Sequence, residues 1–145
     1  LHTEKQDFKL AEDILKTVTQ IDLNYADGFM LLGVLYIELE KYELAVDNLA
    51  VATSLDEKDY YKYFNLASAL NQTKQFDKAA KAAQASVDLK RTFGGGWLEL
   101  GLAELGRKNK TRARKHFEEA KKDRAWREMA ERKIDEILNP EKYEK

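Results

Sequence analysis

Apolar residues recur along this chain at a fixed interval, with polar residues between them at helical spacing. Seven positions in residues 26–59 carry the pattern: Phe29, Leu32, Gly33, Tyr36, Ala45, Leu49 and Ala52. A shift of 34 residues gives Tyr63, Leu66, Ala67, Leu70, Ala79, Ala83 and Ser86, and a second shift gives Trp97, Leu100, Gly101, Glu104, Ala113, Phe117 and Ala120. No insertion or deletion separates the three copies. A constant period of this length indicates stacked repeats and not a closed globule.

The period predicts the boundaries of the units. It places them at residues 1–25, 26–59, 60–93 and 94–127, followed by a terminal helix and tail at 125–145. In residues 1–25, apolar residues lie one period before the second helix of the next unit, at Phe8, Ala11, Leu15 and Val18. We therefore expect residues 4–20 to form the second helix of a truncated unit, and the natural protein to extend further toward its N-terminus.

Each complete unit is predicted to contain two helices. The first unit has helices from about 26 to 39 and from about 42 to 54, and the second from 59 to 74 and from 75 to 89. The last helix, 125–138, has one polar face, as the open end of a repeat array requires for solubility, and Asn139-Pro140 ends it.

Small residues inside the helices are expected to mark close packing. Gly33 lies in mid-helix, where a glycine usually has a packing reason, and we expect Ala45 to supply the opposing small surface. The alanine-rich second helix of residues 60–93 predicts a less stable unit. Residues 94–96 are all glycine, which predicts either a hinge or, as the favoured interpretation, a frayed first turn.

The repeated order of residues resembles a known family. A large residue, Leu-Gly, Tyr, then Ala, an aromatic residue and Ala is similar to the signature of the tetratricopeptide repeat, over three full copies and partial copies at both ends. The resemblance implies an all-α, right-handed solenoid of helix-turn-helix repeats with a C-terminal capping helix. It also implies a non-catalytic module for protein–protein interaction.

Composition narrows the class further. Of the 145 residues, 43% are hydrophobic and 35% charged, which suits a mostly helical protein with a core. The chain has no cysteine, so disulfides and thiolate sites are excluded. There is no apolar run long enough to span a membrane and no recognisable targeting segment, so the sequence does not indicate a compartment.

Residues that could support catalysis do not converge. His2 lies in a terminal tail and His116 is expected on a helix surface, so no ligand spacing for a metal is present. The acidic pair Glu118-Glu119 and the acidic residues between 40 and 43 fall at positions expected to face water, whereas paired carboxylates catalyse only inside a cleft. We therefore predict no enzyme activity, no metal and no cofactor.

In the family that the chain resembles, the first helix of each repeat lines a concave groove. Carried onto this sequence, the groove positions are mostly apolar, with an amide patch near the middle. The predicted partner-binding residues are Met30, Val34, Ile37, Tyr61, Phe64, Asn65, Ser68, Gln72, Leu98 and Leu102. Such a surface favours binding of an extended peptide or an amphipathic helix of another protein.

Two other interpretations use the same groove. In one, the chain is a structural scaffold or spacer whose groove is filled by its own missing helix or by a second copy, so self-association stays open. In the other, the groove binds the acidic tails of chaperones, as in some members of the family. Those members bind the tail through a set of lysines, arginines and asparagines in the groove. Of that set only Asn65 is present here, and Met30, Leu98 and Glu99 stand where such members carry basic or asparagine side chains. Chaperone-tail binding is therefore not expected.

One basic segment interrupts an otherwise acidic chain. Residues 107–127 hold 10 basic and three acidic residues, whereas residues 1–106 hold 11 basic and 17 acidic. The segment 107–122 could contact an acidic protein or nucleic acid. No aromatic residues for stacking on bases interleave with the basic run 107–115, and the footprint is narrow, so a solvated helix face is favoured over a nucleic-acid partner.

Overall fold

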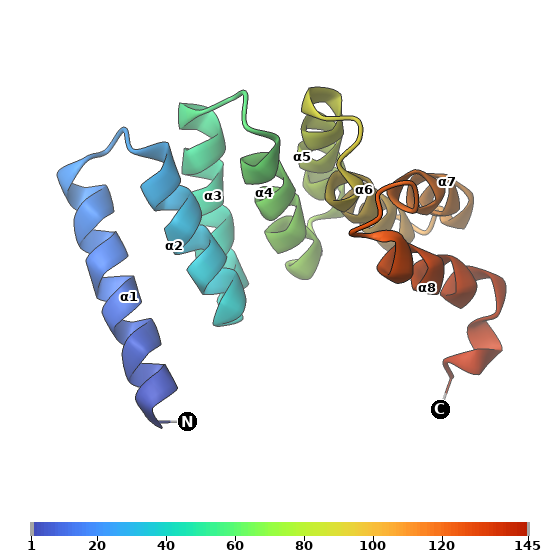
Figure 1. Ribbon diagram of the computed structural model, residues 1–145, viewed down its shortest axis with the longest axis horizontal. Coiled ribbons are helices and arrows are strands. Elements are labelled where there is room, and N and C mark those ends of the chain that lie inside the picture. Colours follow the sequence, from blue (N-terminus) through green and yellow to red (C-terminus); the bar gives the residue numbers. More distant parts are fainter. Residues whose placement is uncertain (1, 145) are drawn as a thin grey trace.

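The computed structural model describes residues 2–144, which form an array of helices (Figure 1). The helices are α1 (His2–Ile21), α2 (Ala26–Glu38), α3 (Tyr42–Leu55), α4 (Tyr60–Gln72), α5 (Phe76–Leu89), α6 (Gly94–Gly106), α7 (Lys110–Ala120) and α8 (Arg127–Leu138), followed by the 3-10 turn η1 (Pro140–Lys142). No strand occurs within this part of the chain. The prediction of an all-α solenoid of helix-turn-helix repeats is confirmed.

The turn inside each repeat has the same backbone conformation. Glu40, Lys74 and Lys108, each 34 residues after the last, have φ angles of 59°, 61° and 65°. The following residue then donates its N–H back across the helix end, as in the 2.8 Å bond from Lys41 N to the Tyr36 carbonyl. A left-handed residue of this kind satisfies the last carbonyls of a helix and reverses the chain. The structural period therefore matches the sequence period.

Close packing of the two helices within a repeat depends on the small residue at mid-helix. A Cβ atom added to Gly33 would collide with Leu49, and one added to Gly101 would collide with Phe117. Ala67 and Ala83 hold the equivalent positions of the middle repeat, where both are fully buried. A glycine thus faces a large residue in two repeats, whereas two alanines share the space in the third. The prediction that Ala45 opposes Gly33 is wrong, because Leu49 holds that place.

Contacts between repeats give the array its curvature. The first helices of successive repeats touch, since α2 contacts α4 and α4 contacts α6. The second helices are further apart, and a cavity of about 710 Å³ separates α5 from α7, lined by residues such as Lys81 and His116. Because the first helices are closer together, the array bends with α2, α4 and α6 on its inner side. We call the surface of these three helices the inner face.

The two ends of the array differ. At one end α8 packs on the last repeat, where Ala130 and Ile134 are buried against Phe117. At the other, the Tyr36 hydroxyl donates a 2.8 Å hydrogen bond to the Glu12 carboxylate and ties α1 to α2. The outer side of α1 carries exposed apolar residues, with Leu10 at 59% and Ile14 at 53%.

The three glycines at the start of α6 are helical and buried, so they do not form a loose first turn. A Cβ atom at Gly94 would lie 2.7 Å from Cβ of Asp123, and one at Gly96 would lie 2.8 Å from Cγ1 of Val87. The Gly94 N–H donates a 2.7 Å hydrogen bond to Oδ2 of Asp123, which fixes the helix start. The glycines thus allow close approach of neighbouring segments, and the hinge and frayed-turn interpretations are both replaced by this packing role.

Among the described residues, none of the helices combines the length and apolar character needed to cross a membrane.

Candidate protein-binding face

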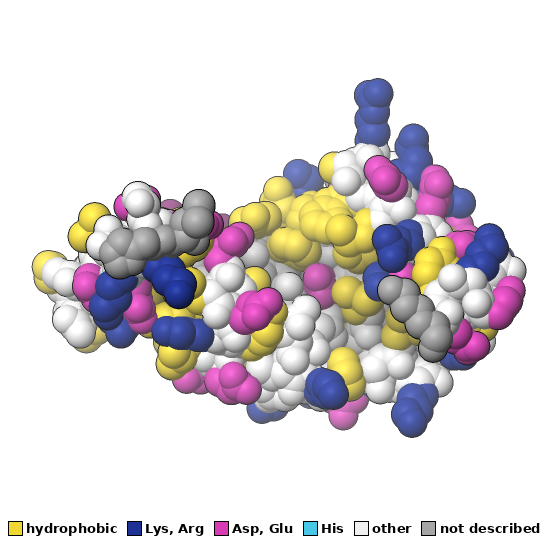
Figure 2. Space-filling view, turned by 90° about the horizontal axis from the view of Figure 1, so that it is seen from below, with side chains coloured by type: hydrophobic (Ala, Val, Ile, Leu, Met, Phe, Trp, Pro, Cys, Tyr) yellow, Lys and Arg dark blue, Asp and Glu magenta, His cyan; other side chains and the backbone are white. Residues whose placement is uncertain are grey.

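The inner face has a cluster of aromatic rings near the starts of α4, α6 and α8, which we call the aromatic cluster: Tyr60, Tyr61, Phe64, Phe93 and Trp126. Phe64 lies at its middle, with ring centroids 5.1 Å from Phe93 and 5.5 Å from Trp126. These edge-to-face arrangements are the ones that aromatic quadrupoles favour. Tyr61 remains 44% exposed, so the cluster presents rings to solvent. Figure 2 shows hydrophobic side chains gathered near the middle of the molecule, between its two ends.

The aromatic cluster exists because three separate segments converge on Gly95. A Cβ atom at Gly95 would lie 2.5 Å from Phe93, 2.9 Å from Trp126 and 3.0 Å from Phe64. Phe93 precedes α6, and Trp126 precedes α8. Sequence reasoning selected Phe64 and Tyr61 as contacts but neither Phe93 nor Trp126. The lack of a side chain at Gly95 was the available signal that other rings fill this place.

Met30, Val34 and Ile37 lie on α2, and all three are half-buried. Met30 and Ile37 pack against the cluster formed by α2 and α3, which also receives Phe8 and Leu15 of α1. Val34 is in no core cluster of the described residues and is therefore the member of the three with the least internal packing.

The predicted residues of α4 and α6 divide into exposed and buried groups. On α4, Gln72 is exposed, Ser68 is half-buried, and Asn65 is 6% exposed with its amide donating to the Tyr61 carbonyl. On α6, Leu102 is half-buried. Leu98 is 2% exposed, in the cluster that α8 completes. The prediction of Leu98 as an accessible contact is wrong because the capping helix covers it. Asn65, also predicted as a contact, is buried and its amide already donates to the Tyr61 carbonyl.

A buried carboxylate lies beside the aromatic cluster on the inner face. Glu99 of α6 is 7% exposed, and one of its carboxylate oxygens, Oε2, accepts a 2.8 Å hydrogen bond from Nδ2 of Asn71. Burial raises the pKa of Glu99 to about 7, although hydrogen bonds from Asn71 and Ser68 act in the opposite direction. Oδ1 of Asn71 is buried without a hydrogen-bond partner. Sequence reasoning noted Glu99 only as a mismatch to the chaperone-binding set.

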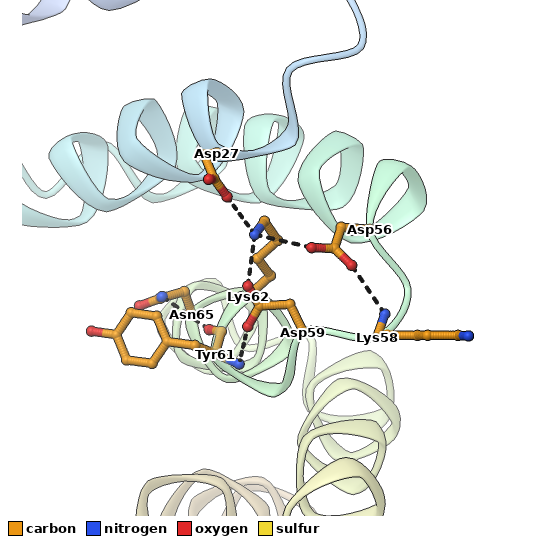
Figure 3. A network of polar contacts seen from close by, with 7 residues as sticks. All are labelled: Asp27, Asp56, Lys58, Asp59, Tyr61, Lys62 and Asn65. Atoms are coloured by element: carbon orange, nitrogen blue, oxygen red, sulfur yellow. Dashed lines mark hydrogen bonds and ion pairs between the residues drawn. The ribbon is translucent and has the colours of Figure 1, made fainter.

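A second buried charge, Lys62, joins the first two repeats (Figure 3). The Lys62 side chain is 2% exposed, and its Nζ lies 2.6 Å from Oδ1 of Asp27, 2.7 Å from Oδ2 of Asp59 and 3.3 Å from Oδ2 of Asp56. Burial by itself would lower the pKa of Lys62, but the three carboxylates outweigh it and raise that pKa. Asp59 also caps α4, because its Oδ1 accepts the Tyr61 N–H at 2.9 Å. Sequence reasoning missed this network.

The basic segment 107–122 lies on α7 and its flanking turns, as predicted. Several of its cations are paired: Arg107 Nε lies 3.1 Å from Asp77, and Lys121 and Lys122 pair with Glu118 and Glu119 one helical turn earlier. His116 lies on α7 beside the cavity between α5 and α7, but it is half-buried and stacks on Trp97 with a centroid distance of 5.8 Å, so it is only partly exposed. Burial lowers the pKa of His116.

Within residues 2–144, no group of three or more His, Asp or Glu side chains is placed to hold a metal ion. The side chain of His2 lies outside the described residues.

Comparison with known proteins agrees with the geometry. Residues 26–59 and 63–93 match the sequence model of the tetratricopeptide repeat. This chain contains tetratricopeptide repeats. The third unit, 94–127, is not part of the match, but its turn at Lys108 repeats the backbone conformation of the other two. A comparison with curated proteins gave no match.

Solved structures with the same fold extend over nearly the whole chain. A crystal structure of MamA has a TM-score of 0.78 at 21% identity, covering 97% of this chain and 92% of that one. YrrB, described as a tetratricopeptide repeat protein with an unusual peptide-binding site, has a TM-score of 0.80 at 21% identity, with 90% and 68% covered. The first tetratricopeptide domain of Spaghetti (RPAP3), bound to the HSP90 peptide SRMEEVD, has a TM-score of 0.74 at 21% identity, with 81% and 93% covered. At these identities the likeness concerns the fold.

Proposed function

We propose that this chain is a non-catalytic interaction module that binds a peptide or an amphipathic helix of another protein on its inner face. The observation that carries the proposal is the aromatic cluster, in which Tyr61 is 44% exposed beside the half-buried Phe64 and Trp126. A contiguous apolar surface of this kind on a repeat protein generally marks an interaction site. Val34 of α2 and Leu102 of α6 are further half-buried apolar residues of the inner face.

The neighbouring structures support binding of a peptide in general terms. YrrB and the Spaghetti (RPAP3) domain are both described with a peptide or a peptide site, and both share the fold of this chain. The acidic peptide bound by the latter is a poor match here, because Glu99 places a carboxylate on the inner face. Like charges brought together in a poorly solvated site oppose binding.

The test is site-specific photo-crosslinking in an extract of the source organism. A benzophenone side chain replaces the exposed Tyr61, and a matched control carries it at Leu44 of α3, which is 43% exposed on a second helix. We expect one partner protein to crosslink from position 61 and not from position 44. Val34→Glu, which places a charge on the inner face, should abolish that crosslink.

Other outcomes separate the alternatives. Crosslinks from position 61 only to a second copy of the chain would support self-association and the scaffold interpretation. Equal crosslinking from positions 44 and 61, or no crosslink that responds to Val34→Glu, would contradict the proposal.

A further inference from the structure

Glu99 and Asn71 bring two hydrogen-bond acceptors together without a cation. The Glu99 carboxylate is 7% exposed and receives hydrogen bonds only from neutral groups, Nδ2 of Asn71 at 2.8 Å and the Ser68 hydroxyl. Oδ1 of Asn71 is buried with no donor. No lysine, arginine or histidine among the described residues forms an ion pair with Glu99.

This arrangement is unusual within the chain itself. The other buried carboxylates have cations: Glu104, on the same helix and 4% exposed, lies 2.9 Å from Nη1 of Arg107, and Glu12 lies 3.2 Å from Nζ of Lys16. A buried carboxylate without a cation costs free energy, as does a buried amide oxygen without a donor. One positively charged donor placed between the two groups would satisfy both.

The acceptors lie next to the aromatic cluster. Ser68, which bonds Glu99, is four residues after Phe64 on α4, and residues at this spacing are neighbours on one helix face, with Cβ atoms about 5–6 Å apart. A partner with an apolar residue on Phe64 would therefore have its next helical turn, or its second residue in an extended chain, over Glu99. The aliphatic stem of lysine or arginine is suited to lie along such rings while its charged end reaches further.

We propose that the inner face selects a partner segment carrying a lysine or arginine about one helical turn from an apolar anchor, with the cation bound by Glu99 and Oδ1 of Asn71. This inference rests on the proposed function and adds the charge of the ligand to it. Glu99 acts as a residue that determines specificity: it favours a basic segment and disfavours the acidic tails considered above. Charge complementarity at a poorly solvated position gives strong discrimination between ligands.

The test is selection of random peptides displayed on phage against the whole chain, followed by affinity measurement on synthetic copies of the selected peptides. Glu99→Gln removes the charge with almost no change of shape. Glu104→Gln is the matched control, a buried glutamate of the same helix that faces Arg107. Val34→Glu identifies peptides that use the inner face. Circular dichroism verifies that each variant is folded.

We expect peptides that lose binding in Val34→Glu to be enriched at least threefold in lysine and arginine near an apolar residue. Their affinity should fall about 10-fold or more in Glu99→Gln and stay within twofold in Glu104→Gln. Replacing the selected lysine or arginine by norleucine should weaken binding to the wild type but not to Glu99→Gln.

Peptides that bind the inner face without enrichment in basic residues, or that bind Glu99→Gln as tightly as the wild type, would overturn the inference and leave the proposed function standing. If no selected peptide responds to Val34→Glu, the proposed function fails, and the inference fails with it.

Discussion

The two interfaces between successive repeats use the same positions with different chemistry. Four residues of the first interface, Asp27, Asp56, Asp59 and Lys62, lie one 34-residue period before Tyr61, Lys90, Phe93 and Gly96 of the second. The first interface is closed by a buried lysine held by three carboxylates. At the second, the lysine becomes a glycine, and two of the acidic positions become rings of the aromatic cluster.

The difference shows what repeat stacking requires. The array requires these positions to be filled and their polar groups satisfied, and either an ion network or aromatic packing meets that condition. A side chain longer than glycine at 96 would meet Val87 and Ser86, so the second interface could not hold a lysine there. The first interface is internally complete, whereas the second keeps Glu99 without a cation. Groups available for a partner are therefore concentrated at the second interface.

The largest expected effect concerns Glu99, the buried carboxylate of the second interface, and it should appear in the pH dependence of stability. Burial raises the pKa of Glu99 to about 7, while an unfolded chain binds that proton with a pKa near 4.5. The folded state therefore holds the proton more tightly, and stability falls as pH rises from about 4.5 to about 7. The difference of the two pKa values corresponds to roughly 3 kcal/mol. Thermal or urea unfolding of the wild type and Glu99→Gln at several pH values measures it.

The comparison with Glu99→Gln isolates this group from the other titrating residues. We expect the variant to gain stability relative to the wild type across that pH range and to stay level with it below pH 4.5. A stability difference that does not change between pH 4.5 and 8 would show that Glu99 titrates normally.

Removing a ring from the aromatic cluster should destabilise the chain without any dependence on salt. Phe93 contacts Tyr60, Phe64 and Trp126 with centroid distances of 4.8, 5.1 and 6.0 Å. Phe93→Ala should lower the free energy of unfolding by about 2.5 kcal/mol, less than for a fully buried phenylalanine because Phe93 is half-buried. Urea unfolding at low and high salt measures this loss. A loss below about 1 kcal/mol would mean that the rings do not hold the second interface together.

The equivalent change at the first interface should depend on pH. Lys62→Met leaves Asp27, Asp56 and Asp59 without their cation and should cost about 2 kcal/mol at pH 7, since the three carboxylates remain partly exposed. Although burial alone would raise the pKa of Asp59, its hydrogen bonds with Lys62 and the Tyr61 N–H and the charge of Lys62 together outweigh this and lower it. Asp59 therefore stabilises the fold above the unfolded pKa of 3.8, and this contribution is lost as pH falls through the folded value.

The effect of Lys62→Met should consequently shrink below about pH 4, as measured by urea unfolding at several pH values. Lys58→Met is the control, because Lys58 contacts Asp56 only through its backbone N–H. An equal loss in both variants would show that the charge of Lys62 is not what joins the repeats.

Whether a feature of the structure could be predicted from the sequence depends on how far apart in the chain its contacting residues lie. The period, the helix pairs and the glycine at 33 were predictable because they depend on residues within one 34-residue unit. Burial of Leu98 was not, because α8 lies outside the period and nothing in the repeat pattern specifies where it packs. The contact between Trp126 and Phe64 was unpredictable for the same reason, because Trp126 directly precedes α8. The environment of Glu99 required the distance between two repeats, which a pattern of residue types does not contain.

The weakest contact of the Lys62 network provides the finest test of the comparison. Asp56 lies 3.3 Å from Lys62 and is 41% exposed, whereas Asp27 and Asp59 lie at 2.6 and 2.7 Å. Asp56→Asn keeps an acceptor for the Lys58 N–H and removes only a solvent-screened charge, so it should cost no more than about 0.5 kcal/mol. The urea midpoint relative to Lys62→Met measures this. A loss as large as that of Lys62→Met would mean that the three carboxylates act as one unit. The stability of the first interface would then depend on each single charged group, as the stability of the second depends on Glu99.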